Sequence, residues 1–145
     1  MSAEAGGRSA LDAVAWRKLV LAADPAGSLD AALLLRRTGT LLAAWTRGEV
    51  PVDVVSVMAA TLVGSVETMV GAVHCASPRT IRMETEQCQM LAARVDPKTI
   101  LVLIAPSEVR EAQIRQQARQ IAAQVAGEAR DARRLVPEAA LVPRS

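Results

Sequence analysis

The sequence predicts an α+β domain in which a five-stranded, mainly antiparallel sheet has helices on both of its faces. Apolar runs and turn signals follow one another in the order α-β-β-α-β-β-β-α. Two of the strand-like runs, residues 31–35 and 99–105, lack the alternation of a half-exposed strand. Strands of this kind are usually buried on both faces, so helices must cover both sides of the sheet.

Length and composition indicate one domain with an aliphatic core. The chain has 145 residues, and apolar residues make up 51% of it, but its only aromatic residues are Trp16 and Trp45. A core of Leu, Val, Ile, Ala and Met favours closely packed helices and sheet over an aromatic-lined pocket. The net charge is +2, and arginines are interleaved with acids, which is not typical of a nucleic-acid-binding surface.

The first half of the chain predicts one helix, a hairpin and a second, longer helix. Residues 9–23 form the first helix, with Ser9 as N-cap and Asp12 in the first turn. Strands at residues 31–37 and 40–46 are joined by a turn at Thr38-Gly39. Pro51 suits the first turn of a helix that then runs over residues 52–74 with few charges.

The second half predicts three strands and a last helix. The strands cover residues 79–85, 88–95 and 99–105, with a turn at residues 96–98. We expect Ser107 to be the N-cap of the last helix, which carries Glu108 and Glu111 in its first turn and ends at about residue 126. The predicted domain therefore covers residues 9–127.

The segments that flank this domain predict a flexible leader and a loose tail. Residues 1–8 lack a basic segment followed by an apolar run, so no export signal is visible and we expect a cytoplasmic location. Residues 128–145 are polar, basic and contain proline. Their ending, Leu141-Val-Pro-Arg144, resembles part of a thrombin recognition sequence and is consistent with an expression scar.

The long middle helix has two faces of different composition. At 100° per residue, one face should lie on the sheet and consists of Val55, Ala59, Leu62, Val63, Val66, Val70 and Val73. A second stripe is small and uncharged, and consists of Val57, Ala60, Thr61, Gly64, Thr68 and Gly71. Each glycine costs about 1 kcal/mol relative to alanine inside a helix, and close packing against a second helix would offset that cost.

We hypothesise that this small-residue stripe is a dimer interface. One alternative is that another part of the same chain covers it. Another is that the helix spans a membrane, because its length is sufficient. Glu67, several Ser and Thr residues and the lack of a flanking basic cluster argue against a membrane span.

The sequence contains no convincing catalytic, cofactor or metal site. His74 is the only histidine, and Cys75 beside it would point elsewhere at a helix end. Cys75 and Cys88 fit no metal or disulfide spacing, so both are expected to be reduced and half-buried. No phosphate-binding GxxxxGK[ST] motif is present, so the chain is not itself a GTPase of that type.

The acidic residues on the first of the last three strands leave two interpretations open. Glu84 and Glu86 are two residues apart and would share one face. They could form a paired-carboxylate site. The simpler interpretation is an edge strand that carries charge to prevent aggregation.

Four segments in this order resemble the roadblock family, also called the dynein light-chain roadblock family. They are the strand and glycine hairpin at residues 33–39 (LLLRRTG), the small-residue helix at 55–62 (VSVMAATL), the strand at 80–84 (TIRME) and the strand at 100–104 (ILVLI). The resemblance covers about residues 9–126. Members of the family are non-catalytic, and they dimerise through the middle helix and the third strand, which joins two five-stranded sheets into one.

The resemblance implies a homodimeric regulator or scaffold that binds a small Ras-like GTPase, without a cofactor. Its dimer interface would include the small-residue stripe together with Ile81 and Met83 on the third strand. The candidate partner-binding residues are Asp53, Glu67, Arg37 and Arg47. The alternative is a ligand-sensing or purely structural dimerisation module of similar topology.

Overall fold

The structure, a computed structural model, describes residues 12–134, with side chains described as far as residue 127. The elements in chain order are α2 (Ala13–Ala23), β1 (Ala31–Arg36), β2 (Leu41–Thr46), α3 (Val52–Ala72), β3 (Thr80–Glu84), β4 (Cys88–Asp96), β5 (Thr99–Pro106) and α4 (Glu111–Arg134). This order and the five-stranded sheet confirm the predicted fold class.

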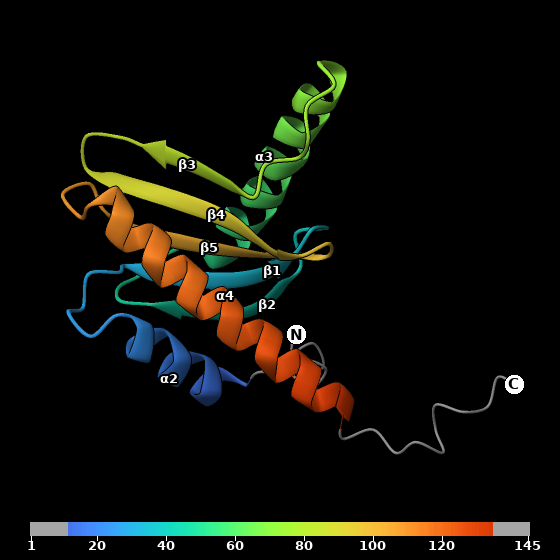
Figure 1. Ribbon diagram of the computed structural model, residues 1–145. Coiled ribbons are helices and arrows are strands. Elements are labelled where there is room, and N and C mark those ends of the chain that lie inside the picture. The colour runs from blue at the N-terminus through green and yellow to red at the C-terminus, as the bar shows by residue number, and fades with distance from the viewer. Residues whose placement is uncertain (1–11, 135–145) are drawn as a thin grey trace, which may run out of the picture.

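The strands form one antiparallel sheet in the order β2-β1-β5-β4-β3, so β2 and β3 are its edges. The central strands β1 and β5 are the two runs that lack alternation, and nearly all of their side chains are buried. Helices α2 and α4 lie on one face of the sheet, whereas α3 lies on the other (Figure 1).

Two separate cores fill the spaces between the sheet and its helices. The core under α2 and α4 is centred on Trp16, Leu103 and Ile114. The Trp16 indole nitrogen donates a 3.0 Å hydrogen bond to the carbonyl oxygen of Ala32, so the buried aromatic residue keeps a polar partner. The core under α3 is smaller and includes Leu33, Leu35, Ala59, Val63 and Val102.

Both flanking helices begin later than predicted. The N-cap of α2 is Asp12, whose carboxylate accepts a 2.8 Å hydrogen bond from the Ala15 amide, and Ser9 lies outside the described residues. Helix α4 begins at Glu111, so the prediction that Ser107 caps it is wrong. Strand β5 continues to Pro106, and the Ser107 hydroxyl instead donates a 2.8 Å bond to the carbonyl oxygen of Glu86.

Helix α4 also ends later than predicted, at Arg134 instead of about residue 126. Residues 128–134 are Glu, Ala and Arg with one Asp, and most of these residues favour helix. The leader at residues 1–8 and the end of the tail at residues 135–145 lie outside the described residues, so both assignments stay predictions.

The C-terminus of α3 is a Schellman motif. The His74 amide donates to the carbonyl oxygen of Gly71 at 3.0 Å, and the Cys75 amide donates to that of Val70 at 2.8 Å. His74 occupies the left-handed position with φ 63°, where glycine is the usual residue. This end of α3 extends past the sheet (Figure 1).

Candidate interaction surface

Helix α3 contacts the sheet through a narrow face. Only Ser56, Ala59 and Val63 are buried. The Ser56 hydroxyl donates a 2.7 Å bond to the carbonyl oxygen of Val52, so a polar side chain is accommodated at this contact. The predicted face was therefore correct for Ala59 and Val63, but its Val73 is 66% exposed.

Contacts with other parts of the chain explain why the buried face of α3 differs from the predicted one. Gly39 in the β1–β2 turn has φ 100°, and a Cβ atom there would lie 3.4 Å from the Cα atom of Val57. The hairpin thus packs against the Val57 and Ala60 side of α3. On the same side of the helix, Glu67 turns toward Arg37 and Arg94. Because α3 is apolar almost all round, hydrophobicity alone could not locate its sheet-facing side.

Part of the predicted small-residue stripe packs against the β1–β2 hairpin and the core, and the rest is exposed at the surface. Ala60 packs against the core, and Val57 lies beside Gly39 although it remains 53% exposed. The exposed Thr61 and Thr68 hydroxyls donate to carbonyl oxygens of Val57 and Gly64, four residues before them. A Cβ atom added at Gly64 or Gly71 would meet nothing within 4 Å, so no described residue packs closely over either glycine.

A stripe of larger apolar side chains lies beside the predicted one. Val54, Met58 and Met69 are each about 60% exposed, and Leu62 lies between them at helical spacing. A hollow at the helix–strand junction is lined by Val54, Val55, Met58, Ala59, Leu62, Met83 and Met90. Val54, Met58 and Met69 were not predicted from the sequence, although methionines clustered on a helix and a nearby strand are typical of adaptable binding surfaces.

Strand β3 continues this apolar surface to the edge of the sheet. Ile81 packs partly against the core under α3, whereas Met83 is 42% exposed beside Met58 and Leu62. Both residues were predicted to belong to the dimer interface, and the structure places them next to α3. The α3 surface and the free edge of β3 thus form one continuous face, which no described part of the chain covers.

Helix α3 is also the one helix in residues 12–134 that is long and apolar enough to cross a membrane. This criterion considers only the length and composition of the helix. Its narrow buried face lies on the sheet and Glu67 is held in ion pairs, so part of its apolar surface is explained by packing within the chain.

Two of the predicted partner-binding residues bind each other. The Arg37 guanidinium pairs with the Glu67 carboxylate, and Arg94 lies 3.8 Å from the other oxygen of that carboxylate. The Glu67 side chain is only 11% exposed, so its charge interacts mainly with Arg37 and Arg94 within the protein. Asp53, in contrast, lies exposed in the first turn of α3.

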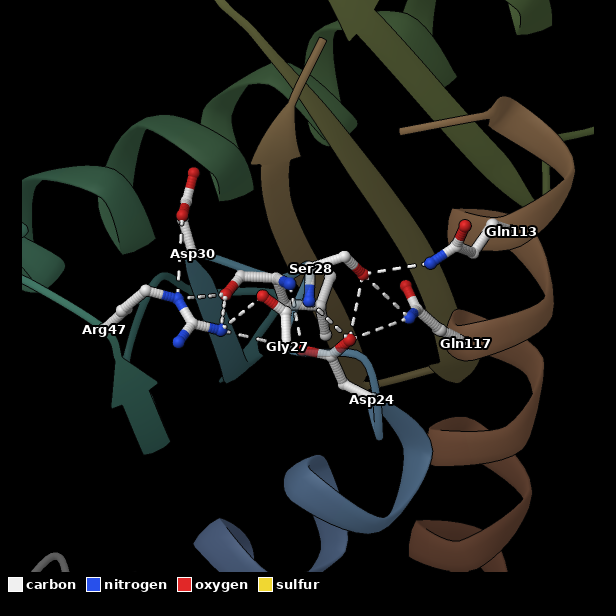
Figure 2. A network of polar contacts seen from close by, with 8 residues as sticks. Asp24, Gly27, Ser28, Asp30, Arg47, Gln113 and Gln117 are labelled. Atoms are coloured by element: carbon white, nitrogen blue, oxygen red, sulfur yellow. Dashed lines mark hydrogen bonds and ion pairs between the residues drawn. The ribbon is translucent and has the colours of Figure 1, made fainter. Parts of the chain in front are cut away.

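Arg47, the remaining predicted partner-binding residue, belongs to a polar network that closes the loop between α2 and β1 (Figure 2). Its guanidinium donates to the carbonyl oxygens of Gly27 and Leu29 at 2.8–3.0 Å. The same guanidinium lies 5.4 Å from the Trp45 ring centre, within cation–π range. Arg47 therefore has a structural role, and about half of its side chain stays accessible.

The centre of this network is the buried carboxylate of Asp24. It accepts hydrogen bonds from the Ser28 amide (2.8 Å), the Ser28 hydroxyl (2.9 Å), the Leu29 amide (2.9 Å) and the Gln117 side-chain amide (3.1 Å). Figure 2 shows Asp24 between the loop and α4. The network joins the loop to α4 and leaves the Asp24 side chain without solvent access, so it holds the loop in place against the helix.

A second polar cluster connects β3 with α4. Arg82 lies 3.5 Å from Glu84 and 3.6 Å from Glu111, and its Nε donates a 3.0 Å bond to Gln89. Arg115 donates a 2.7 Å bond to Glu111, and this bond, with the nearby charge of Arg82, lowers the pKa of the Glu111 carboxyl. Glu84 thus belongs to an ion-pair cluster on the edge strand.

The residues considered for nucleophilic or metal chemistry do not converge. His74 and Cys75 are exposed at the end of α3, and Cys88 lies half-buried at the start of β4, 3.6 Å from the Thr85 hydroxyl. In residues 12–134 no three His, Cys, Asp or Glu side chains are grouped as metal ligands.

Known proteins share both the sequence pattern and the fold of this chain. A model of the Roadblock/LC7 domain family matches residues 18–105. A solved structure described as MglB with tetrameric arrangement is similar to this chain with a TM-score of 0.71 and 17% identity, covering 91% of this chain and 95% of that one. No curated protein matches the sequence at a significant level.

Two further similar solved structures are bacterial MglB proteins. Gliding protein MglB from Thermus thermophilus has a TM-score of 0.69 and 15% identity, covering 80% of this chain and 89% of that chain. Myxococcus xanthus MglB has a TM-score of 0.66 and 12% identity, covering 76% and 86% respectively. At such identities the likeness shows the shared fold.

Proposed function

Because this chain belongs to the Roadblock/LC7 domain family, we propose that it is a non-catalytic, cytoplasmic regulator or scaffold that forms a homodimer and binds a small Ras-like GTPase. The family resemblance supplies the class of partner. The mechanism would be preferential binding to one nucleotide state of the GTPase, which shifts the population of that state.

The observation that carries the dimer is the apolar stripe of α3 next to the free edge of β3. Val54, Met58, Met69 and Met83 are all exposed on one continuous face. Contiguous apolar surface of this kind marks interaction sites in soluble proteins, and methionine side chains adapt to a partner surface. A second copy of the chain would bury this stripe.

Two double variants, each with two arginine substitutions, test which side of α3 is the interface. Met58→Arg with Met69→Arg places two charges on the larger apolar stripe, and we expect this variant to sediment as a monomer where wild type is a dimer. Gly64→Arg with Gly71→Arg does the same on the small-residue stripe, where both sites have open space. Loss of the dimer in the glycine variant would assign those residues to the interface as well.

The matched control is Gln120→Arg with Gln124→Arg, which adds the same charge on the exposed side of α4. It should sediment like wild type. Circular dichroism must show that all three variants are folded. If folded wild-type protein sediments as a monomer at about 100 µM, or if both α3 variants remain dimers, the proposed interface is wrong.

The GTPase part of the proposal has its own test. The small Ras-like GTPase encoded nearest to this gene is purified, loaded with GDP or with a non-hydrolysable GTP analogue, and titrated with this protein in a calorimeter. We expect binding to one nucleotide state to be at least tenfold tighter, which corresponds to about 1.4 kcal/mol. Equal binding in both states, or none, would refute regulation and favour a purely structural dimer module.

The accessible charges near α3 are candidate contacts for that partner. Asp53 is exposed, and the Arg37 side chain is 40% exposed despite its ion pair with Glu67. Asp53→Ala and Arg37→Ala should each weaken GTPase binding if these residues touch the partner. Unchanged affinity in both would remove them from the proposed docking surface.

A further inference from the structure

Helix α2 carries apolar and basic side chains on the side that faces away from the core. Trp16 and Val20 are buried against the sheet. At 100° per residue, the opposite side of the helix consists of four residues, all of them exposed: Val14, Arg17, Lys18 and Leu21. Val14 is 65% exposed and Leu21 39% exposed, and a shallow surface hollow is lined mainly by the same four residues. We call these four residues the α2 stripe.

The outer surface of the layer formed by α2 and α4 is positively charged. Helix α2 and residues 112–127 of α4 contain four basic residues and no Asp or Glu. Arg115 has a carboxylate partner at the start of α4, but within residues 12–127 no carboxylate lies within ion-pair distance of Arg17, Lys18 or Arg119. In α3, by contrast, the only charged residues are two acids. The two helical layers therefore differ in the sign of their charge.

We propose that the α2 stripe binds the surface of a membrane that contains anionic lipids, with α2 parallel to the membrane plane. Val14 and Leu21 enter the boundary between the lipid headgroups and the acyl chains, while Arg17 and Lys18 contact the anionic headgroups. Helices with basic residues beside exposed apolar residues bind membranes in this way. The long apolar stems of Arg and Lys allow their charges to reach the headgroups from beside the buried residues. The contact is peripheral and does not require any helix to span the membrane.

The size and shape of this surface favour a membrane over a protein partner. A specific protein interface buries about 800 Å² on each partner and depends on a few apolar or aromatic anchors in well-packed pockets. The α2 stripe has only two apolar side chains on one convex helix. An anionic membrane surface instead attracts every nearby cation over a distance of about 8–10 Å at physiological salt. The unpaired cations therefore contribute without forming specific ion pairs.

The homodimer of the proposed function would present the α2 stripe twice. If two sheets join edge to edge, as the family resemblance implies, both copies keep the layer of α2 and α4 on the same face of the joined sheet. Both stripes can then contact one membrane, and the second contact becomes intramolecular. This layer lies on the side opposite α3 (Figure 1), so the GTPase-binding surface proposed near α3 stays accessible. Only this doubling rests on the homodimer, because each stripe contacts the membrane by itself.

Vesicle co-sedimentation tests the proposal with the full-length protein. One set of sucrose-loaded vesicles contains about 40% phosphatidylglycerol in phosphatidylcholine, and the other contains phosphatidylcholine alone. We expect the protein to bind the anionic vesicles at least tenfold more tightly than the neutral ones in about 0.1 M NaCl. This binding should be largely lost in about 0.5 M NaCl, because salt screens the attraction.

A charge-neutralising variant locates the contact. A basic residue near an anionic membrane surface increases affinity about fivefold, so Arg17→Gln with Lys18→Gln should weaken binding by about tenfold or more. The matched control is Arg79→Gln with Lys98→Gln, which removes two exposed positive charges outside the layer of α2 and α4. The control should bind within about twofold of wild type.

A fluorescent probe gives a readout that does not depend on affinity. In a background with Cys75→Ser and Cys88→Ala, the dye NBD is attached at Val14→Cys or, as a control, at Glu86→Cys in the hairpin between β3 and β4. Anionic vesicles should shift the emission of the probe at position 14 to shorter wavelength and increase its intensity, because the dye enters an apolar environment. The probe at position 86 should not respond.

Each contrary result has a distinct meaning. Wild-type protein that does not bind anionic vesicles would overturn the proposal and leave an acidic protein as the occupant of the α2 stripe. Equal losses in the two double variants, or a response only at position 86, would overturn the assignment to α2. Altered sedimentation of Arg17→Gln with Lys18→Gln in the absence of vesicles would show that a second copy covers the stripe. This variant should bind the GTPase like wild type in calorimetry, so failure of the membrane proposal and failure of the GTPase proposal are observed separately.

Discussion

Replacing Asp24 with alanine should cause a large loss of stability although the residue is far from the proposed interface. Its carboxylate accepts hydrogen bonds from the amides of Ser28 and Leu29, the Ser28 hydroxyl and the Gln117 side chain. After truncation, Gln117 and Ser28 keep their own 3.2 Å contact. The two loop amides, one of them in the fully buried Leu29, lose their acceptor.

The magnitude follows from those two amides. A buried donor left without a partner costs about 1–3 kcal/mol. We therefore expect Asp24→Ala to lower the free energy of unfolding by about 3–4 kcal/mol, and Asp24→Asn, which keeps one oxygen acceptor, to cost about half as much. Urea denaturation followed by circular dichroism measures both values, at one protein concentration because dimerisation contributes to apparent stability.

Asp30→Ala is the matched control for this measurement. Asp30 lies 3.9 Å from the same Arg47 guanidinium, but its side chain is 43% exposed. An exposed ion pair of this kind contributes little, so we expect a change below about 0.5 kcal/mol. A loss of less than about 1 kcal/mol for Asp24→Ala, or equal losses at both positions, would refute the assignment of Asp24 as the centre of the network.

Three further predictions concern other elements. His74→Gly should raise the free energy of unfolding by about 0.5–1 kcal/mol, because glycine accepts the φ of 63° at the Schellman position, whereas His74→Ala should not stabilise. Glu67→Ala should cost about 1–2 kcal/mol, since it leaves Arg37 and Arg94 without their carboxylate, and a stable variant would show that this ion pair is unimportant. The lowered pKa of Glu111 means that its stabilising contribution is present above the unfolded-state pKa and is lost as pH falls through the folded-state pKa. In Arg115→Gln the pKa of Glu111 should rise toward the ordinary value of a glutamate in an NMR titration, and an unchanged pKa would exclude Arg115 as the main cause.

The sequence was sufficient to predict the order of elements and the antiparallel sheet, because these depend on local patterns. The buried central strands are continuous apolar runs, and the turn before β2 contains the glycine that its φ of 100° requires. The ends of the helices were less accurate. Strand β5 and α4 are separated by a turn in which Ser107 bonds to Glu86, and a contact over that distance leaves no local signal.

The interaction surface shows the limit of such local patterns. The middle helix was recognisable as unusually apolar from residue types alone, whereas the third strand entered the predicted interface only through the family resemblance. Which side of α3 faces the sheet was decided by Gly39 packing against Val57 and by the Glu67 ion pairs with Arg37 and Arg94. Those contacts left Met58 and Met69 exposed.

The sequence by itself therefore determined the α+β fold, its element order and the presence of an apolar helix too little charged for ordinary solvent exposure. Only the tertiary structure decided that Arg47 and Asp24 support a loop, and that Arg82 and Glu84 lie together at a free sheet edge. The physical reason is that backbone periodicity follows from neighbours along the chain. The direction and partner of each side chain depend on residues that folding brings close from elsewhere, as Gln117 is brought to Asp24.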